Sequence, residues 1–245
     1  MVFLRKNPES DFLQSRPKSA HALQAPAAVS IFKTFLNVKT PNVTMFDALK
    51  STVAQARQLN VPEDRLAVLT SLTDYVQSKI DQGKEINLNF ICTHNSRRSQ
   101  FSQIWAQTAA DYFGVPAKCY SGGVEVTAFN ERAIASIKRS GFKVVAQGDI
   151  NPIYSVFHSE DHDPIKAFSK LFDDPINQAD QFAAVMTCSH ADENCPFIPG
   201  TEQRIAVRYE DPKAFDDSPQ EAAKYDERSM QIASEMFYVF SKVNL

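Results

Sequence analysis

A cysteine between a predicted strand and a predicted helix is the feature that most constrains this chain. Residues 86–91 read Ile-Asn-Leu-Asn-Phe-Ile, an apolar run with alternating asparagines that predicts a buried strand ending at Cys92. From Ser99 to Phe113 the apolar residues recur at helical spacing, and Ser99 is a favourable residue type for a helix N-cap. The sequence therefore predicts a strand that ends at the cysteine, a short turn over residues 93–98, and a helix.

The turn over residues 93–98 is expected to bind an oxyanion. Backbone N–H groups of such a turn and of the first helical turn converge on one spot, and the helix dipole adds positive potential there. Arg98 contributes a planar guanidinium that can hold two oxygens of one anion. The same positive potential favours the thiolate form of Cys92, which makes it a candidate nucleophile. The alternative is a structural cysteine in front of an arginine-rich helix N-terminus.

The segment from Cys92 to Gln100 resembles the phosphate-binding loop of the low-molecular-weight protein tyrosine phosphatases. It is more similar to the loop of the thioredoxin-coupled arsenate reductases that share that fold, which reads Cys-Thr-Gly-Asn-Ser-Cys-Arg-Ser-Gln. The chain differs from this loop at His94, where the family has glycine, and at Arg97, where it has cysteine. The similarity extends from about Ile86 to the C-terminus. The identical positions are Cys92, Thr93, Asn95, Ser96, Arg98, Ser99 and Gln100.

This resemblance implies a role for each loop residue. Cys92 would attack the bound oxyanion and Arg98 would hold it. Ser99 would stabilise the Cys92 thiolate by donating a hydrogen bond, and Asn95 would fix the loop. The substrate-binding residues implied by the resemblance are Thr93, His94, Asn95, Ser96, Arg97 and Ser99.

Composition places the chain among ordinary globular proteins. Its 245 residues, 43% hydrophobic and 22% charged, suit one domain with an appendage or at most two small domains. A net charge of −3 gives no electrostatic reason to expect nucleic acid or an anionic membrane as a partner. No apolar run approaches the roughly 20 residues of a membrane helix, and the start lacks the features of a signal peptide. Four cysteines in a chain of this length do not form a disulfide framework, so we expect a cytoplasmic protein.

Three regions are predicted along the chain. Residues 1–43 form a weakly ordered extension, and Met45, where organised sequence begins, is a candidate translation start. Residues 44–84 form an N-terminal helical hairpin that packs on the rest of the chain or mediates dimerisation. Residues 85–245 form the phosphatase-like domain.

Strands and helices alternate through that domain, which predicts an α/β fold with a small parallel four-stranded sheet flanked by helices. Further helices are expected after Asn130, over residues 164–172, and over residues 219–243. The four strands are expected at residues 86–92, 116–123, 182–187 and 204–208.

Three reactive side chains follow three of these strands. In such sheets the ligand binds outside the carboxyl ends of the strands. Cys92, Cys188 and Asp211 all lie at this position in the predicted topology. Cys119 lies inside a strand and is expected to be a packed small side chain.

Cys188 and Cys195 are a second group of candidate functional residues. On a regular helix they would share a face but lie about 10 Å apart, whereas a disulfide requires Cα atoms within about 7 Å, so the segment must loosen if they pair. One alternative is a zinc site made by Cys188, His190 and Cys195, although their spacing fits no common finger. Another is two unrelated buried cysteines.

The arsenate reductases carry such a pair, with the second cysteine followed by proline, as Pro196 follows Cys195 here. Plain phosphatases of this fold lack it. The resemblance therefore implies that Cys188 attacks Cys92, that Cys195 attacks Cys188, and that a thioredoxin-type dithiol reduces the final disulfide. It implies no metal and no organic cofactor.

Asp211 is the candidate general acid, because Asp211-Pro212 matches the Asp-Pro pair of the family and follows the fourth predicted strand. The alternative is an ordinary turn, since Asp-Pro often begins one. Lys213 stands where tyrosine phosphatases usually carry aromatic residues, which disfavours a phosphotyrosine substrate. The sequence thus predicts reduction of arsenate to arsenite. The alternatives are a low-molecular-weight protein tyrosine phosphatase with a phosphocysteine intermediate, or a non-catalytic oxyanion-binding module.

Overall fold

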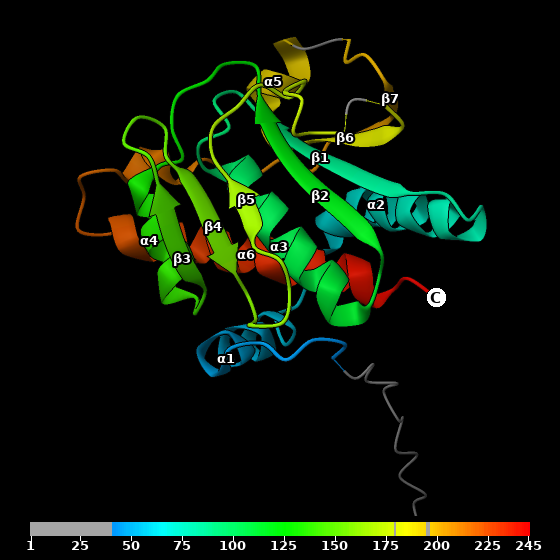
Figure 1. The fold of residues 1–245 in the computed structure, drawn as a ribbon, viewed down its shortest axis with the longest axis horizontal. Coiled ribbons are helices and arrows are strands. Elements are labelled where there is room, and N and C mark those ends of the chain that lie inside the picture. The colour runs from blue at the N-terminus through cyan, green and yellow to red at the C-terminus, as the bar shows by residue number, and fades with distance from the viewer. Residues whose placement is uncertain (1–40, 179, 195–196) are drawn as a thin grey trace, which may run out of the picture. The chain divides into compact units, whose positions relative to one another are not determined.

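Four parallel strands form the main sheet, in the order β2-β1-β6-β7 (Figure 1). The structure, a computed structural model, describes residues 41–178, 180–194 and 197–245. β1 pairs with β2 on one side and with β6 on the other, and it is buried along its whole length. The predicted parallel sheet is therefore confirmed. The strands are β1 (Ile86–Cys92), β2 (Ala117–Gly123), β6 (Phe182–Met186) and β7 (Thr201–Ile205).

Helices flank this sheet, and two of them make the centre of the core. α3 and α6 pack on each other, and α3 also packs against β1 and β2. Within the described residues, no helix combines the length and the apolar character needed to cross a membrane. The helices are α1 (Asp47–Ala56), α2 (Glu63–Asp81), α3 (Arg98–Phe113), α4 (Glu131–Arg139), α5 (Ser189–Asn194) and α6 (Glu221–Ser241), with a 3₁₀ helix η1 (Pro212–Phe215).

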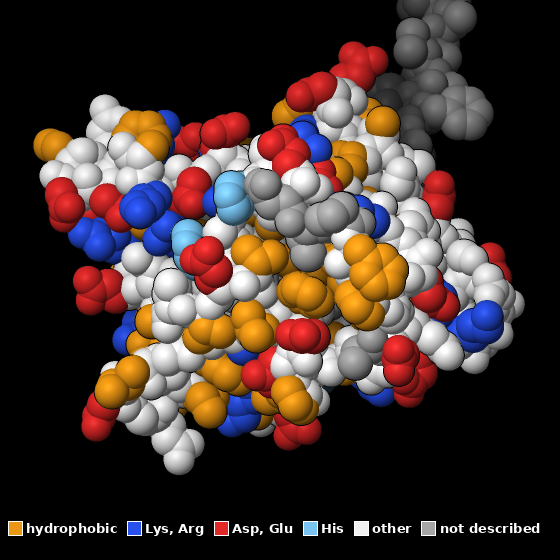
Figure 2. Space-filling model, turned by 90° about the horizontal axis from the view of Figure 1, so that it is seen from above, with side chains coloured by type: hydrophobic (Ala, Val, Ile, Leu, Met, Phe, Trp, Pro, Cys, Tyr) orange, Lys and Arg blue, Asp and Glu red, His pale blue; other side chains and the backbone are white. Residues whose placement is uncertain are grey.

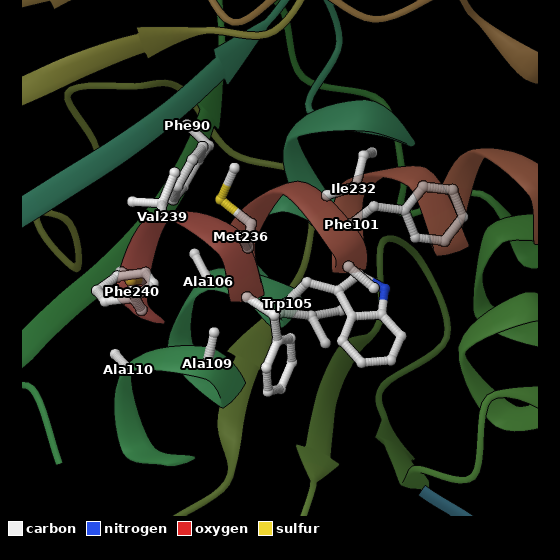
Figure 3. Packing of buried hydrophobic residues seen from close by; sticks show 14 of the residues in the cluster. Phe90, Phe101, Trp105, Ala106, Ala109, Ala110, Ile232, Met236, Val239 and Phe240 are labelled. Atoms are coloured by element: carbon white, nitrogen blue, oxygen red, sulfur yellow. The ribbon is translucent and has the colours of Figure 1, made fainter. Parts of the chain in front are cut away.

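Small residues on α3 let α6 approach it closely. Figure 3 shows Ala106 and Ala109 of α3 turned toward α6, where Met236 lies. The Trp105 indole is fully buried beside them, and its Nε1 donates a hydrogen bond to Ser229 Oγ at 2.9 Å. That bond satisfies the one polar atom of the largest core side chain, so the close packing of α3 and α6 leaves no orphaned donor on it.

The two predicted N-terminal helices are present as α1 and α2, and both pack against α6. Leu49 and Val53 of α1, and Leu69 and Leu72 of α2, belong to the same hydrophobic core as the sheet. The division of the chain at residue 85 stays a prediction. The extension predicted over residues 1–43 lies outside the described residues up to residue 40.

A second sheet, antiparallel and in the order β3-β4-β5, was not predicted. Its strands are β3 (Lys143–Gln147), β4 (Ile153–Phe157) and β5 (Ile165–Ala167). The prediction of a helix over residues 164–172 is wrong. Ile165 and Ala167 are buried while Lys166 between them is exposed, which is the alternation of a strand, but three residues are too few to reveal it in the sequence.

The fourth strand of the main sheet lies earlier than predicted, at Thr201–Ile205 instead of residues 204–208. The backbone N–H of Val207 turns back to donate to the Ile205 carbonyl at 3.2 Å, and this tight turn takes the chain out of the ladder. Val207 is nevertheless fully buried, which explains its strand-like sequence pattern.

Candidate active site

The loop between β1 and α3 surrounds the Cys92 thiol with polar groups. Cys92 Sγ lies 3.1 Å from Ser99 Oγ, and Asn95 Nδ2 donates to the same Ser99 Oγ at 2.8 Å. Because its hydroxyl is used in this way, Ser99 does not cap the helix. α3 begins at Arg98, with Arg97 as the N-cap residue and no side-chain cap bond. The predicted N-cap at Ser99 is therefore wrong, while Ser99 and Cys92 do lie in contact.

Asn95 carries the backbone strain of the loop. Its φ is +46°, a left-handed conformation that asparagine tolerates better than most residues. Asn95 is fully buried, and its Oδ1 accepts a hydrogen bond from the Lys170 backbone N–H at 3.1 Å. His94 is not among the residues with positive φ, so the histidine that replaces the family's glycine carries no such strain.

His94 lies at the rim of the loop. Its Nε2 is 3.2 Å from Glu125 Oε2, and the His94 side chain is partly exposed while that of Glu125 is largely exposed. Ser96, by contrast, donates its hydroxyl to the Ala128 carbonyl at 2.7 Å and so ties the loop to the segment that follows β2. The loop is therefore anchored at Ser96 and also at the His94 carbonyl, which accepts from Ser169 Oγ at 2.8 Å, while the His94 side chain reaches solvent.

Asp211 contacts both arginines of the loop. Its Oδ1 accepts from Arg97 Nε at 2.9 Å, and its Oδ2 accepts from Arg98 at 2.8 Å. Burial raises the pKa of the Asp211 carboxyl, but the positive charges of the Arg98 and Arg97 guanidiniums lower it by more. The pKa of Asp211 therefore lies below its usual value. Arg98 also donates to the Tyr209 carbonyl at 3.1 Å, which fixes its guanidinium beside the loop.

Asp211 has a second, structural contact. Its Oδ1 accepts from the Lys213 backbone N–H at 3.1 Å and caps η1. The turn that the Asp-Pro dipeptide suggested is therefore real. The same residue caps a turn and faces the loop arginines.

Cys188 follows β6 and reaches the loop from the neighbouring strand. The Thr187 backbone N–H donates to the Ile91 carbonyl at 2.7 Å, so the two strands stay paired up to the residue before each cysteine. Cys188 Sγ is buried, accepts from the Ala191 backbone N–H at 3.3 Å, and lies 3.5 Å from Thr93 Oγ1. Figure 1 shows α5, which Cys188 precedes, beside the carboxyl end of the sheet.

His190 is a neighbour of the loop that sequence reasoning considered only as a zinc ligand. Its Nδ1 lies 3.2 Å from Thr93 Oγ1, the hydroxyl that also contacts Cys188 Sγ. Its position two residues after Cys188 in the sequence was the one signal that could have placed it near the loop. Cys195 lies outside the described residues, so the zinc site that would need Cys195 also falls outside them. In the part of the chain that the structure describes, no group of His, Cys, Asp and Glu side chains could hold a metal ion.

α5 is held in place by one carboxylate. Asp192 Oδ1 accepts from Arg204 Nε at 2.8 Å, and its Oδ2 accepts from Arg208 Nε at 2.8 Å. Burial raises the pKa of Asp192, but the two guanidiniums bring it below its usual value. A six-residue helix is too short to be stable alone, so these ion pairs contribute to the position of the segment after Cys188.

A narrow cavity of about 10 Å³ opens onto the loop, with room for about one water molecule. The structure thus brings Cys92, the loop arginines and Asp211 together, and it places Cys188 next to Thr93. The cavity is lined by Cys92, His94, Ser96, Arg97, Arg98 and Asp211.

No protein-family profile matches the chain. Arsenate reductase 2 of Staphylococcus haemolyticus is 32% identical over 124 residues, which cover 50% of this chain and 76% of that protein. The arsenate reductase of Brevibacillus brevis is 30% identical over 124 residues, with 74% of that protein covered. A solved low-molecular-weight protein tyrosine phosphatase from T. tengcongensis aligns with a TM-score of 0.44 and 15% identity, over 65% of this chain and all of that one. The identities and coverage of the bacterial sequences show that this chain belongs to the arsenate reductase family.

Proposed function

We propose that this protein reduces arsenate to arsenite by a relay of three cysteines, Cys92, Cys188 and Cys195, and that a thioredoxin-type dithiol supplies the electrons. One observation carries the proposal: Cys188 Sγ lies 3.5 Å from the hydroxyl of Thr93, the residue next to Cys92. A hydrolase of phosphate esters needs no second thiol at this place. The family membership and the free thiols of Cys92 and Cys188 support the same conclusion.

In the first step the loop binds arsenate and Cys92 attacks it. The backbone N–H groups at the start of α3 and the Arg98 guanidinium hold the arsenate oxygens. The Cys92 thiolate, which Ser99 Oγ can stabilise by a hydrogen bond at 3.1 Å, forms a sulfur–arsenic bond while one arsenic–oxygen bond breaks. Asp211 donates a proton to the departing oxygen, which leaves as water.

Asp211 becomes a suitable acid only once the anion is bound. While the carboxylate contacts both arginines its pKa stays low and it is ionised near neutral pH. An arsenate that takes over the Arg98 guanidinium removes one favourable partner and adds negative charge nearby, and both changes raise the pKa of Asp211. Binding of the substrate therefore prepares the acid.

In the second step the electrons move. The Cys188 thiolate attacks Cys92 Sγ, a disulfide forms, and the sulfur–arsenic bond breaks with its electron pair going to arsenic. Arsenic passes from the pentavalent to the trivalent state and leaves as arsenite. The Thr93 hydroxyl, which contacts both Cys188 Sγ and His190 Nδ1, offers the thiol proton a path to the imidazole.

In the last steps the enzyme is regenerated. Cys195 attacks Cys188 by thiol–disulfide exchange and releases Cys92, and an external dithiol then reduces the Cys188–Cys195 disulfide. Hydrophobic side chains reach the surface on the face of the molecule that Figure 2 shows. Phe197, two residues after Cys195 in the sequence, contributes an exposed aromatic side chain at 77% exposure.

The test compares turnover of three variants with thioredoxin, thioredoxin reductase and NADPH, following NADPH oxidation that depends on arsenate. Cys92→Ser and Cys188→Ser should both abolish multiple turnover. Cys119→Ser is the matched control, because this buried thiol lies in β2 outside the proposed relay, and it should keep most of the activity. A Cys188→Ser variant that turns over arsenate like the wild type would refute the relay.

Hydrolysis of p-nitrophenyl phosphate by the same variants separates the reductase from a phosphatase. We expect Cys188→Ser to keep any aryl-phosphate hydrolysis that the wild type has, because only Cys92, Arg98 and Asp211 serve that reaction. A wild type that hydrolyses phosphate esters well and never consumes thioredoxin would be a phosphatase. A wild type that shows neither activity, and whose anion binding is intact in Cys92→Ser, would be a binding module.

A further inference from the structure

A cavity of about 620 Å³, whose lining shares no residue with that of the catalytic loop, lies between α3, β2 and the segment around β5. Its volume is in the range of small-molecule binding sites in proteins. Gln103 and Gln107 of α3 form one wall, and Tyr120 of β2 and Ile165 of β5 contribute others. The proposed reaction uses none of these side chains.

Lys170 is the unusual residue of this cavity. Lys170 is among the residues that line the cavity, it is 3% exposed, and its buried Nζ has no hydrogen-bond partner among the described residues. Burial lowers the pKa of Lys170 to about 8, and the nearby Asp174 carboxylate offsets only part of that effect. The ammonium lies 4.6 Å from the centre of the Phe168 ring, a contact that does not replace a hydrogen-bonding anion.

The other charged groups of the cavity already have partners or lie toward solvent. Lys118 Nζ pairs with Glu85 at 3.0 Å, and Lys166 Nζ donates to Ser155 Oγ at 2.8 Å, with Lys166 exposed. The Asp111 carboxylate binds His158 Nε2 at 2.8 Å. Asp163 and His162 also line the cavity, and His162 Nδ1 lies 3.4 Å from Ser159 Oγ. One buried positive charge, on Lys170, is thus left for a ligand, and a monoanion matches it better than a dianionic phosphate.

We propose that this cavity is a binding site for a small organic carboxylate, with the carboxylate on the Lys170 ammonium and an apolar body against Ile165, Ile176 and Tyr120. The Asn177 Oδ1 atom on the same wall is also buried without a partner, so it can accept a hydrogen bond from a hydroxyl group of the ligand. The amides of Gln103 and Gln107 give the wall further polar groups.

The site adjoins the catalytic loop but does not overlap it. The Lys170 backbone N–H donates to Asn95 Oδ1 at 3.1 Å, and its carbonyl accepts from the Gly123 N–H at 2.8 Å. The backbone of Lys170 therefore supports the loop, while its side chain serves the cavity. The two sites also differ in chemistry, since the loop suits a tetrahedral oxyanion.

The test is an NMR titration of the ¹⁵N-labelled full-length protein with benzoate, in the presence of saturating inorganic phosphate to occupy the catalytic loop. We expect shifts at amides around the cavity. Benzamide, which has the same shape and no charge, should bind about tenfold more weakly or worse, because it cannot form a charge-assisted bond to Lys170. Lys170→Met should weaken benzoate by a similar factor, whereas Lys118→Met should change it by less than about threefold, because Glu85 already partners that lysine.

Three results would overturn the proposal: benzamide binding as well as benzoate, equal affinity in Lys170→Met, or shifts confined to the catalytic loop. A measurement on the wild type avoids any dependence on how the variant folds. An anionic partner should raise the pKa of Lys170 from about 8, and the side-chain ¹³Cε signal reports this. An unchanged pKa at saturating benzoate would also refute the site.

Discussion

Replacing Asp211 by asparagine should separate anion binding from catalysis. The Asp211 carboxylate accepts hydrogen bonds from Arg97 and Arg98 at 2.9 and 2.8 Å, so it competes with any oxyanion for the same guanidiniums. Asparagine keeps an oxygen that can cap η1 at Lys213, as the carboxylate does at 3.1 Å. The substitution therefore removes the charge with little change to the local fold.

The magnitude follows from the bonds that an anion must displace. A hydrogen bond between charged groups contributes about 1.5–3 kcal/mol. Because the Asp211 side chain is 28% exposed, solvent screening reduces this to about 1–2 kcal/mol for the bond to Arg98. Asp211→Asn should thus bind inorganic phosphate roughly five- to thirtyfold more tightly than the wild type. Loss of the proton donor should slow the first chemical step about 10²–10⁴-fold.

Isothermal titration with phosphate measures the first effect, and rapid-quench detection of the first arsenate-dependent oxidation measures the second. Asp217→Asn is the matched control. The Asp217 side chain is 87% exposed although it pairs with Arg132, and the backbone φ of +59° at this position is one that asparagine tolerates. It should leave both quantities unchanged. Weaker phosphate binding in Asp211→Asn, or an unchanged first step, would refute this account of Asp211.

Three further predictions concern stability, each measured as the free energy of urea unfolding. Gly122→Ala should destabilise the protein by about 2 kcal/mol or more, since the new Cβ would lie 2.2 Å from the Phe172 Cα, and an unaffected midpoint would show that the backbone there can move. Glu235→Gln should cost about 2 kcal/mol or more because it removes the charge of a carboxylate side chain that is only 2% exposed and that pairs with the Arg65 guanidinium, whereas the exposed Glu227→Gln should cost less than about 0.5 kcal/mol; equal costs would contradict the assignment of a buried carboxylate to this ion pair. Because the pKa of Asp211 lies below its usual value of 3.8, the ionised carboxylate stabilises the fold above that pH, and this stabilisation is lost as the pH falls through the lowered pKa. The wild type should therefore lose more stability than Asp211→Asn between about pH 5 and pH 3. Parallel pH profiles of the unfolding free energy would contradict this.

The sheet and the loop were predictable because their signals are local. The run from Ile86 to Cys92 is apolar, and the helix that follows repeats its apolar residues at helical spacing. The parallel topology then places the residues after β1 and β6 at one edge, which is where Cys188 and Thr93 lie in contact. Sequence order and strand geometry were sufficient for that part of the site.

The remaining features depend on contacts between distant parts of the chain. The bonds from Arg97 and Arg98 to Asp211 join residues more than a hundred positions apart, and no local pattern encodes them. The strands β3, β4 and β5 are too short for alternation to be read against the background of turns. Ser99 was expected to cap the helix because of its residue type, but its hydroxyl contacts the Cys92 thiol.

The charge of Lys170 illustrates the same limit. Its sequence neighbourhood, Phe-Ser-Lys-Leu, gives no sign that the ammonium is buried at 3% exposure. Lys170 lines a cavity between α3, β2 and the segment around β5, and although α3 and β2 were predicted, the way these elements pack together was not.

The most direct test of the account is to trap the first disulfide. In a Cys195→Ser variant the relay must stop after Cys188 has attacked Cys92, because the resolving thiol is missing. One equivalent of arsenate should then yield one arsenite per protein and a Cys92–Cys188 disulfide that peptide mass spectrometry identifies, whereas no disulfide should form with phosphate. Arsenite formation without that disulfide, or a disulfide that includes Cys119 instead, would contradict the relay.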